Sequence, residues 1–253
     1  SQEGEQSDVC HPNRTDILVQ FVLRLVCGPE MDTCKSGVSL TINSDYQRDW
    51  PQYFEAVGNQ GPRETLLRAL AAIEPRTHGH PGQAVDVACG EGRDTRKLLS
   101  RGWKVFAFDS HPQAISRLHE SVHRTCTSEA QALLTCRQLS FEEVATTSPW
   151  PARVDLVNAS FALPFCPPDI FPIVWKRLVD SIALGGVFAG QIFGNRDDWA
   201  SIRPQSHYTM EQMRGLFRQF EFMHLEEVEK DGSDALMKTK HHHLFHIVAR
   251  KIL

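Results

Sequence analysis

Short hydrophobic runs alternate along this chain with segments of helical spacing. Runs of five to seven residues predict buried strands at 84–88, 103–108, 133–139, 154–159 and 187–193. Apolar residues recur at helical intervals between them, which predicts helices over 93–101, 112–123 and 169–183. Strands that alternate with such helices predict an α/β fold, a doubly wound parallel sheet with helices on both faces.

The flanking segments extend this pattern. A helix is expected over 62–73, followed by a loop at 74–82 that contains two prolines and two glycines. Toward the C-terminus we expect one more helix and then two paired strands. The Gly185-Gly186 pair is expected to end the helix over 169–183, and Asp231-Gly232 is expected to form the hairpin turn. The last helix and the two strands are predicted at 209–217, 220–229 and 242–250.

Residues 1–44 differ in character from the remainder of the 253-residue chain. They predict an N-terminal extension, partly disordered at 1–7, ahead of a single domain over 45–253. The apolar run 17–27 has eleven residues and contains Arg24, so it is too short to span a bilayer. We expect it to pack on the body or on a second copy of the chain, which would make a homodimer, and we expect no membrane association.

Two glycines lie within four residues of the end of the first predicted strand. The stretch Ala84–Thr95 reads as a strand, then a turn that contains Gly90 and Gly92, then a helix that opens at Arg93. Glycines in such a turn allow positive φ and let the backbone approach a ligand, and the helix N-terminus offers unpaired N–H groups. Asp109 ends the next strand, 17 residues after Gly92, where a carboxylate can accept hydrogen bonds from ribose hydroxyls. An ordinary strand-to-helix turn with a surface aspartate is the alternative interpretation.

The glycine pattern differs from the full dinucleotide fingerprint G-x-G-x-x-G, because the third position after Gly92 is Thr95; position 88 is Ala88. A nucleoside without phosphates fits this turn better than a dinucleotide or a nucleoside triphosphate. The stretch from Asp86 to Gly92 resembles the first motif of class I S-adenosylmethionine-dependent methyltransferases, an acid followed four residues later by Gly-x-Gly. This resemblance implies S-adenosyl-L-methionine as the cofactor and a Rossmann-like methyltransferase sheet of seven strands with the last one antiparallel.

The resemblance to the methyltransferases also implies which positions contact the cofactor. The turn and the ends of the first four predicted strands supply them, with the apolar surface over the adenine expected from the position after the third strand. These residues are Asp86, Ala88, Cys89, Gly90, Gly92, Asp94, Asp109, Ser110, Ser140, Phe141, Asn158 and Ala159. Core packing of Phe141 and a role of Asp109 as a helix cap are the structural alternatives.

The acceptor is expected beside the end of the fourth strand. The loop there reads Asn-Ala-Ser-Phe, whereas methyltransferases of amides or adenine tend to have Asn/Asp-Pro-Pro-aromatic, so that substrate class is disfavoured. Aromatic residues at the start of the domain are expected to close the pocket, or else to pack under the sheet edge. The predicted acceptor-site residues are Ser160, Phe161, Trp50, Phe54 and His243.

Histidines supply the candidate bases. His207 and Tyr208 follow the loop 196–206, a position from which a loop often covers the acceptor pocket, so we predict them as catalytic residues. The alternative is that they flank a helix capped by Thr209. The cluster His241–His243 with His246 contains no cysteine or carboxylate at ligand spacing, so no metal site is predicted.

The stretches Cys89–Asp94, Leu163–Cys166 and Glu226–Lys251 resemble small bacterial methyltransferases of the tellurite-resistance type, and the likeness covers about 50–251. The net charge is −4 with dispersed Lys and Arg, so nucleic acid is not an expected partner. Seven scattered cysteines without a C-x-x-C pair favour reduced thiols and the cytoplasm.

The chain is thus predicted to be an S-adenosylmethionine-dependent methyltransferase that acts on a small-molecule acceptor by in-line displacement. Two alternatives stay open. One is a protein that binds the cofactor without catalysis and acts through partners. The other is a Rossmann enzyme that uses a nicotinamide cofactor, against which the incomplete glycine pattern argues.

Overall fold

A computed structural model of the chain describes residues 50–57, 60–73, 82–147, 149–201 and 206–253. The predicted N-terminal extension and its apolar run lie outside these residues. Within them, no helix is both long and apolar enough to cross a membrane.

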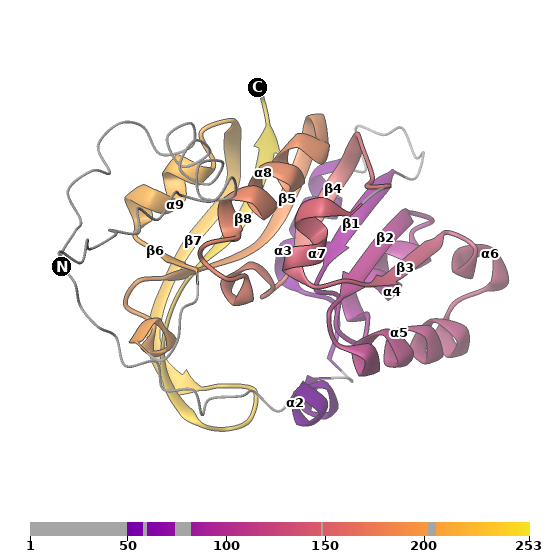
Figure 1. Cartoon of the computed structure of the whole chain (residues 1–253), viewed down its shortest axis with the longest axis horizontal. Coiled ribbons are helices and arrows are strands. Elements are labelled where there is room, and N and C mark those ends of the chain that lie inside the picture. Colours follow the sequence, from indigo (N-terminus) through magenta and orange to yellow (C-terminus); the bar gives the residue numbers. More distant parts are fainter. Residues whose placement is uncertain (1–49, 58–59, 74–81, 148, 202–205) are drawn as a thin grey trace, which may run out of the picture. The chain divides into compact units, whose positions relative to one another are not determined.

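Each predicted helix and strand is present, and the structure adds four short elements that were not predicted (Figure 1). The helices are α2 (Trp50–Val57), α3 (Glu64–Ile73), α4 (Arg93–Ser100), α5 (Pro112–Thr125), α6 (Ser128–Gln131), α7 (Phe141–Thr146), α8 (Phe171–Ser181) and α9 (Met210–Leu216), with 3-10 turns η1 (Leu163–Phe165) and η2 (Asp198–Ser201). The strands are β1 (Gln83–Val87), β2 (Lys104–Asp109), β3 (Leu134–Gln138), β4 (Val154–Ala159), β5 (Ile182–Gly194), β6 (His207–Tyr208), β7 (Phe220–Ser233) and β8 (Thr239–Lys251). The four short elements that were not predicted are α2, α6, α7 and β6.

The strands form one sheet in the order β3-β2-β1-β4-β5-β8-β7, and the two-residue β6 pairs with β5. Strands β1 to β5 are parallel, whereas β8 runs antiparallel to both of its neighbours, β5 and β7. The chain therefore has the predicted Rossmann-like methyltransferase sheet, with an antiparallel last strand. Its order reverses between β1 and β4, and ligands of such sheets bind at the carboxyl ends of the strands there.

Alternate residues of the central strands serve two cores, one on each face of the sheet. Val85 and Phe188 pack with α7, α8 and α9, while Ala84 and Val187 pack with α3, α4 and α5. Because a strand turns successive side chains to opposite faces, the near-continuous apolar runs of the sequence are what a sheet covered on both sides requires. The two helical layers are visible in Figure 1.

Two turn predictions are wrong. Gly185 and Gly186 do not end a helix, because α8 already ends at Ser181 and the pair lies inside β5, where the pairing with β4 shifts register. A Cβ on Gly186 would lie 2.9 Å from the carbonyl oxygen of Ala183, so backbone crowding accounts for that glycine. Asp231 and Gly232 are paired residues of β7.

The hairpin turns instead at 234–238. The Asp234 carboxylate accepts hydrogen bonds from the N–H groups of Leu236 (2.9 Å) and Lys238 (3.0 Å), so this aspartate closes the turn. An aspartate that bonds the backbone two residues on is a standard turn former.

Candidate functional site

The turn after β1 carries three residues in the left-handed region. They are Ala88 (φ 47°), Gly90 (φ 55°) and Gly92 (φ 83°). Gly92 precedes the first residue of α4, and a Cβ there would lie 2.1 Å from Cδ1 of Leu118 on α5. The turn can therefore pass close to α5 only because this position has no side chain.

Asp109 fixes this turn from the end of the neighbouring strand β2. Its carboxylate accepts hydrogen bonds from the N–H groups of Gly90 (3.0 Å) and His111 (2.9 Å). Burial raises the pKa of Asp109, and these backbone donors oppose that shift. Each carboxylate oxygen has two lone pairs, so Asp109 can still accept hydrogen bonds from a ligand.

A buried polar network lies behind the turn. The Asp86 carboxylate accepts hydrogen bonds from the Thr95 hydroxyl (2.5 Å) and from the Asn158 amide (2.9 Å). The same amide donates to Asp94 (3.0 Å), whose other oxygen accepts the N–H of Arg63 (2.8 Å). Burial, and secondly the nearby charge of Asp94, raise the pKa of Asp86 to about 7. The network ties β1, β4, α4 and the start of α3 together.

A cavity of about 260 Å³ opens above this network, close to the lower end of the range for small-molecule sites, about 300–1,000 Å³. Twelve of the predicted site residues line it. They are Asp86, Ala88, Cys89, Gly90, Asp94, Asp109, Ser110, Phe141, Ser160, Phe161, Trp50 and Phe54. The tertiary structure thus brings together the turn, the ends of β1, β2 and β4, and the aromatic helix α2.

Four predicted cofactor residues do not line the cavity. Asn158 is fully buried and holds Asp86 and Asp94 from behind, while Gly92 and Ala159 pack against neighbouring elements. Ser140 caps α7 in a capping box with Glu143. These four residues therefore affect the cavity indirectly, by holding the residues and elements that line it.

The predicted site residues did not include Arg63, Glu91 and Arg93, although all three line the cavity. Glu91 lies within the glycine motif, and its Oε1 atom is buried without a hydrogen-bond partner among the described residues. Burial raises the pKa of Glu91. An unpartnered buried oxygen at a cavity wall fits a ligand that supplies a donor. Arg63 precedes a helix without any motif, so no sequence signal singles it out.

A second cavity of about 280 Å³ adjoins the first. Tyr53, Val57, Arg63, Phe161 and Phe165 line both cavities. The second cavity is otherwise walled by Phe193, Trp199, the hairpin turn and the side chains of Lys240 and His242. A small molecule in one cavity would therefore meet a ligand in the other at a shared aromatic wall.

The predicted catalytic pair lies elsewhere. His207 and Tyr208 form β6, which pairs with β5, and neither residue lines either cavity. The Tyr208 ring packs 5.2 Å from the ring of Phe171, and the His207 ring lies 5.9 Å from that of Phe193. Thr209 caps α9, which agrees with the alternative interpretation that His207 and Tyr208 flank a capped helix.

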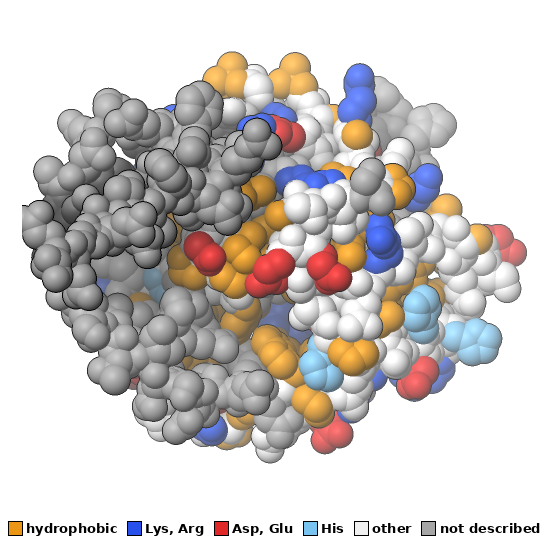
Figure 2. Space-filling view, in the orientation of Figure 1, with side chains coloured by type: hydrophobic (Ala, Val, Ile, Leu, Met, Phe, Trp, Pro, Cys, Tyr) orange, Lys and Arg blue, Asp and Glu red, His pale blue; other side chains and the backbone are white. Residues whose placement is uncertain are grey.

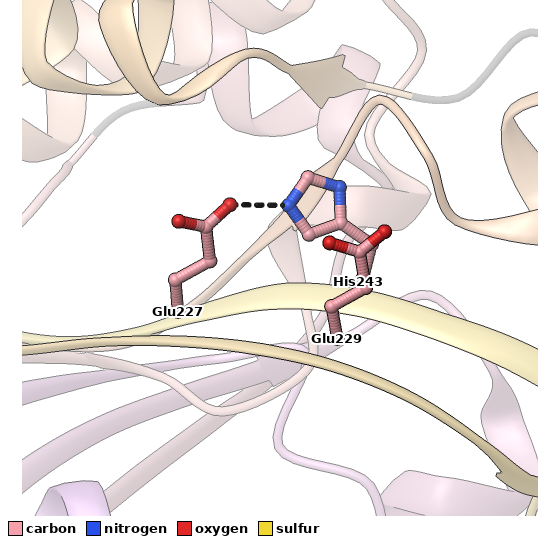
Figure 3. A group of neighbouring side chains, drawn as sticks. All are labelled: Glu227, Glu229 and His243. Atoms are coloured by element: carbon pink, nitrogen blue, oxygen red, sulfur yellow. Dashed lines mark hydrogen bonds and ion pairs between the residues drawn. The ribbon is translucent and has the colours of Figure 1, made fainter.

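His243 likewise lines neither cavity. It is fully buried, and its Nδ1 accepts the N–H of Arg196 (3.1 Å), so Nε2 carries the proton and donates to Glu227 (2.9 Å; Figure 3). His242 is the histidine of the cluster that lines the second cavity.

The histidine cluster contains no carboxylate in the sequence, but carboxylates reach it from the neighbouring strand, because β7 pairs with β8. Glu227 and Glu229 on β7 bring carboxylates to His243, with ligand atoms within 4.8 Å of one another (Figure 3). Such a group could hold a metal ion. Here the Arg196 guanidinium bonds both carboxylates, to Glu227 at 3.0 Å and to Glu229 at 2.6 Å, and so occupies the place of the cation.

On the face shown in Figure 2, the Lys and Arg side chains of the described residues stand singly among other side chains and form no continuous patch. The cysteines at 89, 126, 136 and 166 are free thiols.

Comparison with known proteins adds the family. Residues 84–186 match the protein family described as "Methyltransferase domain". A search of curated proteins finds no match to this chain.

Solved structures of methyltransferases share the fold at low sequence identity. TehB from Haemophilus influenzae has a TM-score of 0.62 at 14% identity, and the match covers 79% of this chain and 65% of TehB. The N-methyltransferase NodS from Bradyrhizobium japonicum, in complex with S-adenosylhomocysteine, has a TM-score of 0.53 at 16% identity, with 81% and 93% covered.

A third similar structure is the 1,6-didemethyltoxoflavin-N1-methyltransferase of Burkholderia thailandensis with bound 1,6-didemethyltoxoflavin and S-adenosylhomocysteine. Its TM-score is 0.53 at 19% identity, with 75% of this chain and 79% of that chain covered.

Proposed function

Because this chain carries a class I S-adenosylmethionine-dependent methyltransferase domain, we propose that it transfers a methyl group to a small-molecule acceptor bound in the second cavity. The observation that carries the proposal is a pair of adjoining cavities that share five lining residues. The first lies at the carboxyl ends of β1 and β2 and beside the loop after β4, and the second lies beside the β7–β8 hairpin. The family and the fold imply S-adenosylmethionine as the cofactor.

The residues of the first cavity fit that cofactor. Asp109 would accept hydrogen bonds from the two ribose hydroxyls, and Phe141, Ser110 and His111 would enclose the adenine. The turn at Ala88–Gly90 would face the amino-acid part, near the buried carboxyl of Asp86. Trp50 and Phe54 on α2 would exclude water from the reacting atoms.

The bound cofactor supplies a sulfonium methyl group; an acceptor lone pair forms the new bond to its carbon while the carbon–sulfur electrons stay on sulfur. The chain holds the acceptor and the cofactor in position and keeps water away from them. Phe161 and Phe165, which line both cavities, form the apolar wall where the two molecules would meet. A thiol acceptor needs little further help, whereas an oxygen or nitrogen acceptor gains from a base.

His242 is the base that the geometry favours for such acceptors. Its Nε2 lies 3.2 Å from the carbonyl oxygen of Ser233, so this nitrogen carries the proton and Nδ1 keeps a lone pair. Burial lowers the pKa of His242, which keeps the ring neutral at pH 7 and able to accept a proton. A His242→Gln variant should lose turnover with phenols and keep it with thiols.

Calorimetric titration with S-adenosylhomocysteine, followed by methyl-transfer assays over phenols, thiols and amines, tests the proposal. Asp109→Ala should weaken binding at least tenfold, since hydrogen bonds to a charged group contribute about 1.5–3 kcal/mol. The control Asp180→Asn alters an exposed carboxylate that pairs with Lys176, and it should leave affinity unchanged.

Three results would count against parts of this assignment. Unchanged affinity of Asp109→Ala would remove the ribose contact. Binding without transfer to any acceptor would favour a non-catalytic binding protein. Binding of NAD in preference to S-adenosylhomocysteine would favour a nicotinamide enzyme. A small-molecule acceptor and a cytoplasmic setting, which the free thiols support, remain parts of the proposal.

A further inference from the structure

The second cavity has a wall of aromatic rings. The rings of Phe165, Phe193 and Trp199 lie 5.8–6.3 Å apart between centroids, and Phe161 joins them at 6.4 Å from Phe193. Such mutually packed rings make a rigid apolar surface that suits a flat ring through offset or edge contacts.

Arg63 gives this surface a positive charge. Its guanidinium lies 4.5 Å above the Phe161 ring, and its backbone N–H is held by Asp94 at 2.8 Å. Within the part of the chain that the structure describes, no carboxylate pairs with this guanidinium, and the residue lines both cavities. The donors of Arg63 are therefore available to an anionic ligand group.

The second cavity has two other charged side chains, Lys240 and Asp234, and each has contacts of its own. Lys240 is 3% exposed and pairs with the buried Asp197 at 2.5 Å. The carboxylate of Asp234 accepts two backbone N–H groups of the hairpin turn. His242 is neutral at pH 7 because burial lowers its pKa. Among the cations of this cavity, Lys240 has a carboxylate partner, whereas the Arg63 guanidinium has none among the described residues.

The aromatic rings of the second cavity are not suited to bind a cationic ligand. Arg63 already lies over Phe161, and the Lys240 ammonium lies 4.1 Å from the Trp199 ring and 5.0 Å from that of Phe193. An aromatic cage that binds an ammonium ligand needs free ring faces and no nearby positive charge.

We propose that the methyl acceptor is a planar aromatic or heteroaromatic molecule with a carboxylate or similar oxyanion, its ring against Phe165 and Trp199 and its anion on Arg63. This inference rests on the proposed function and specifies the acceptor of the same site. Planar Arg guanidinium and carboxylate groups match in two parallel hydrogen bonds, which would also orient the ring toward the shared wall.

The test compares matched phenols by calorimetry on the full chain saturated with S-adenosylhomocysteine. The probes are 4-hydroxybenzoate as the anion, 4-hydroxybenzamide as its neutral counterpart and tyramine as the cation. We expect the anion to bind at least tenfold more tightly than the other two, and to be the best methyl acceptor of the three. Equal affinities, or a preference for tyramine, would overturn the proposal.

Variants test whether Arg63 causes the preference for the anionic probe. Arg63→Gln should reduce it to less than twofold, Arg63→Lys should retain part of it, and Arg68→Gln should behave as the wild type. Arg68 lies on α3, the helix that Arg63 directly precedes, and it is half-exposed in a pair with Glu64. The Arg68 variant therefore controls for the loss of an arginine near this helix. Urea unfolding of each variant identifies any that misfold.

Failure of this inference is distinguishable from failure of the proposed function. If S-adenosylhomocysteine does not bind the wild type, the proposed function fails. If it binds, but Arg63→Gln weakens that binding and leaves the probe preference intact, Arg63 belongs to the cofactor site and the acceptor inference is overturned.

Discussion

Gly92 illustrates how one missing side chain sets the shape of the turn after β1. Its φ of +83° is strained for any L-residue, and a Cβ would meet Leu118 at 2.1 Å. Gly185 has the same φ, but a Cβ there would have no atom within 4 Å, so this glycine offers a matched control.

Gly92→Ala should therefore lower the free energy of unfolding by at least about 2 kcal/mol, from left-handed strain together with overpacking. Gly185→Ala should cost only about 1 kcal/mol, from the strain alone. Urea denaturation of both variants gives the difference. Equal losses would mean that Leu118 moves aside without cost.

Asp86 should make the stability of the fold depend on pH. Its pKa is about 7 in the folded chain, against an ordinary value of 3.8, because burial and the charge of Asp94 disfavour the carboxylate. The folded state thus holds a proton that the unfolded state releases between about pH 4 and pH 7. This group therefore lowers stability as the pH rises through that window, and its cost is constant above pH 7.

Asp86→Asn should remove this effect. The stability of the variant relative to wild type should increase from pH 4 to pH 7 by an amount on the order of a few kcal/mol, and then level off. Urea unfolding at four pH values measures it, with Asp180→Asn as the exposed control. A difference that does not vary with pH would show that Asp86 titrates normally.

Among the elements, the β7–β8 hairpin supplies one part of the wall of the second cavity. Lys240 and His242 come from β8, and Ser233 to Ala235 come from the end of β7 and its turn. Asp234 accepts the N–H groups of Leu236 and Lys238, so it sets where the hairpin reverses and which β8 side chains reach the cavity.

Asp234→Ala should destabilise the fold by about 1.5–3 kcal/mol per lost charge-assisted bond and weaken acceptor binding. Asp234→Asn keeps a carbonyl oxygen for the same donors and should lose less. Hydrogen exchange of the Leu236 and Lys238 amides would report the turn directly. Unchanged protection in the alanine variant would show that strand pairing alone fixes it.

The whole molecule should respond to its cofactor. A ligand at a hundredfold excess over Kd stabilises a protein by about 2.7 kcal/mol. For a chain of this size each kcal/mol shifts Tm by about 2–4 °C, so saturating S-adenosylhomocysteine should raise Tm by roughly 5–11 °C. NAD at the same concentration should cause no shift. A scanning fluorimetry experiment with both ligands decides between the two cofactor classes.

The sheet could be predicted from the sequence because its strands are covered on both faces. Residues 84–88 and 154–159 must then be largely apolar, and the turn at Gly90 and Gly92 leaves its own mark between strand and helix. The position of the hairpin turn could not be predicted from the sequence. Asp231-Gly232 has the composition of a turn, but its pairing with His241 and Lys240 holds it in β7.

By itself, the sequence determined the succession of the main strands and helices, the glycine turn after β1 and the carboxylate at the end of β2, since each depends on neighbours within about 20 residues. Only the tertiary structure decided which distant groups share a cavity. Arg63, Phe165 and His242 are brought to the second cavity from separate elements, while His207, Tyr208 and His243 are not. Local patterns report a residue's own backbone and burial, whereas an acceptor site depends on side chains that converge only when the sheet has formed.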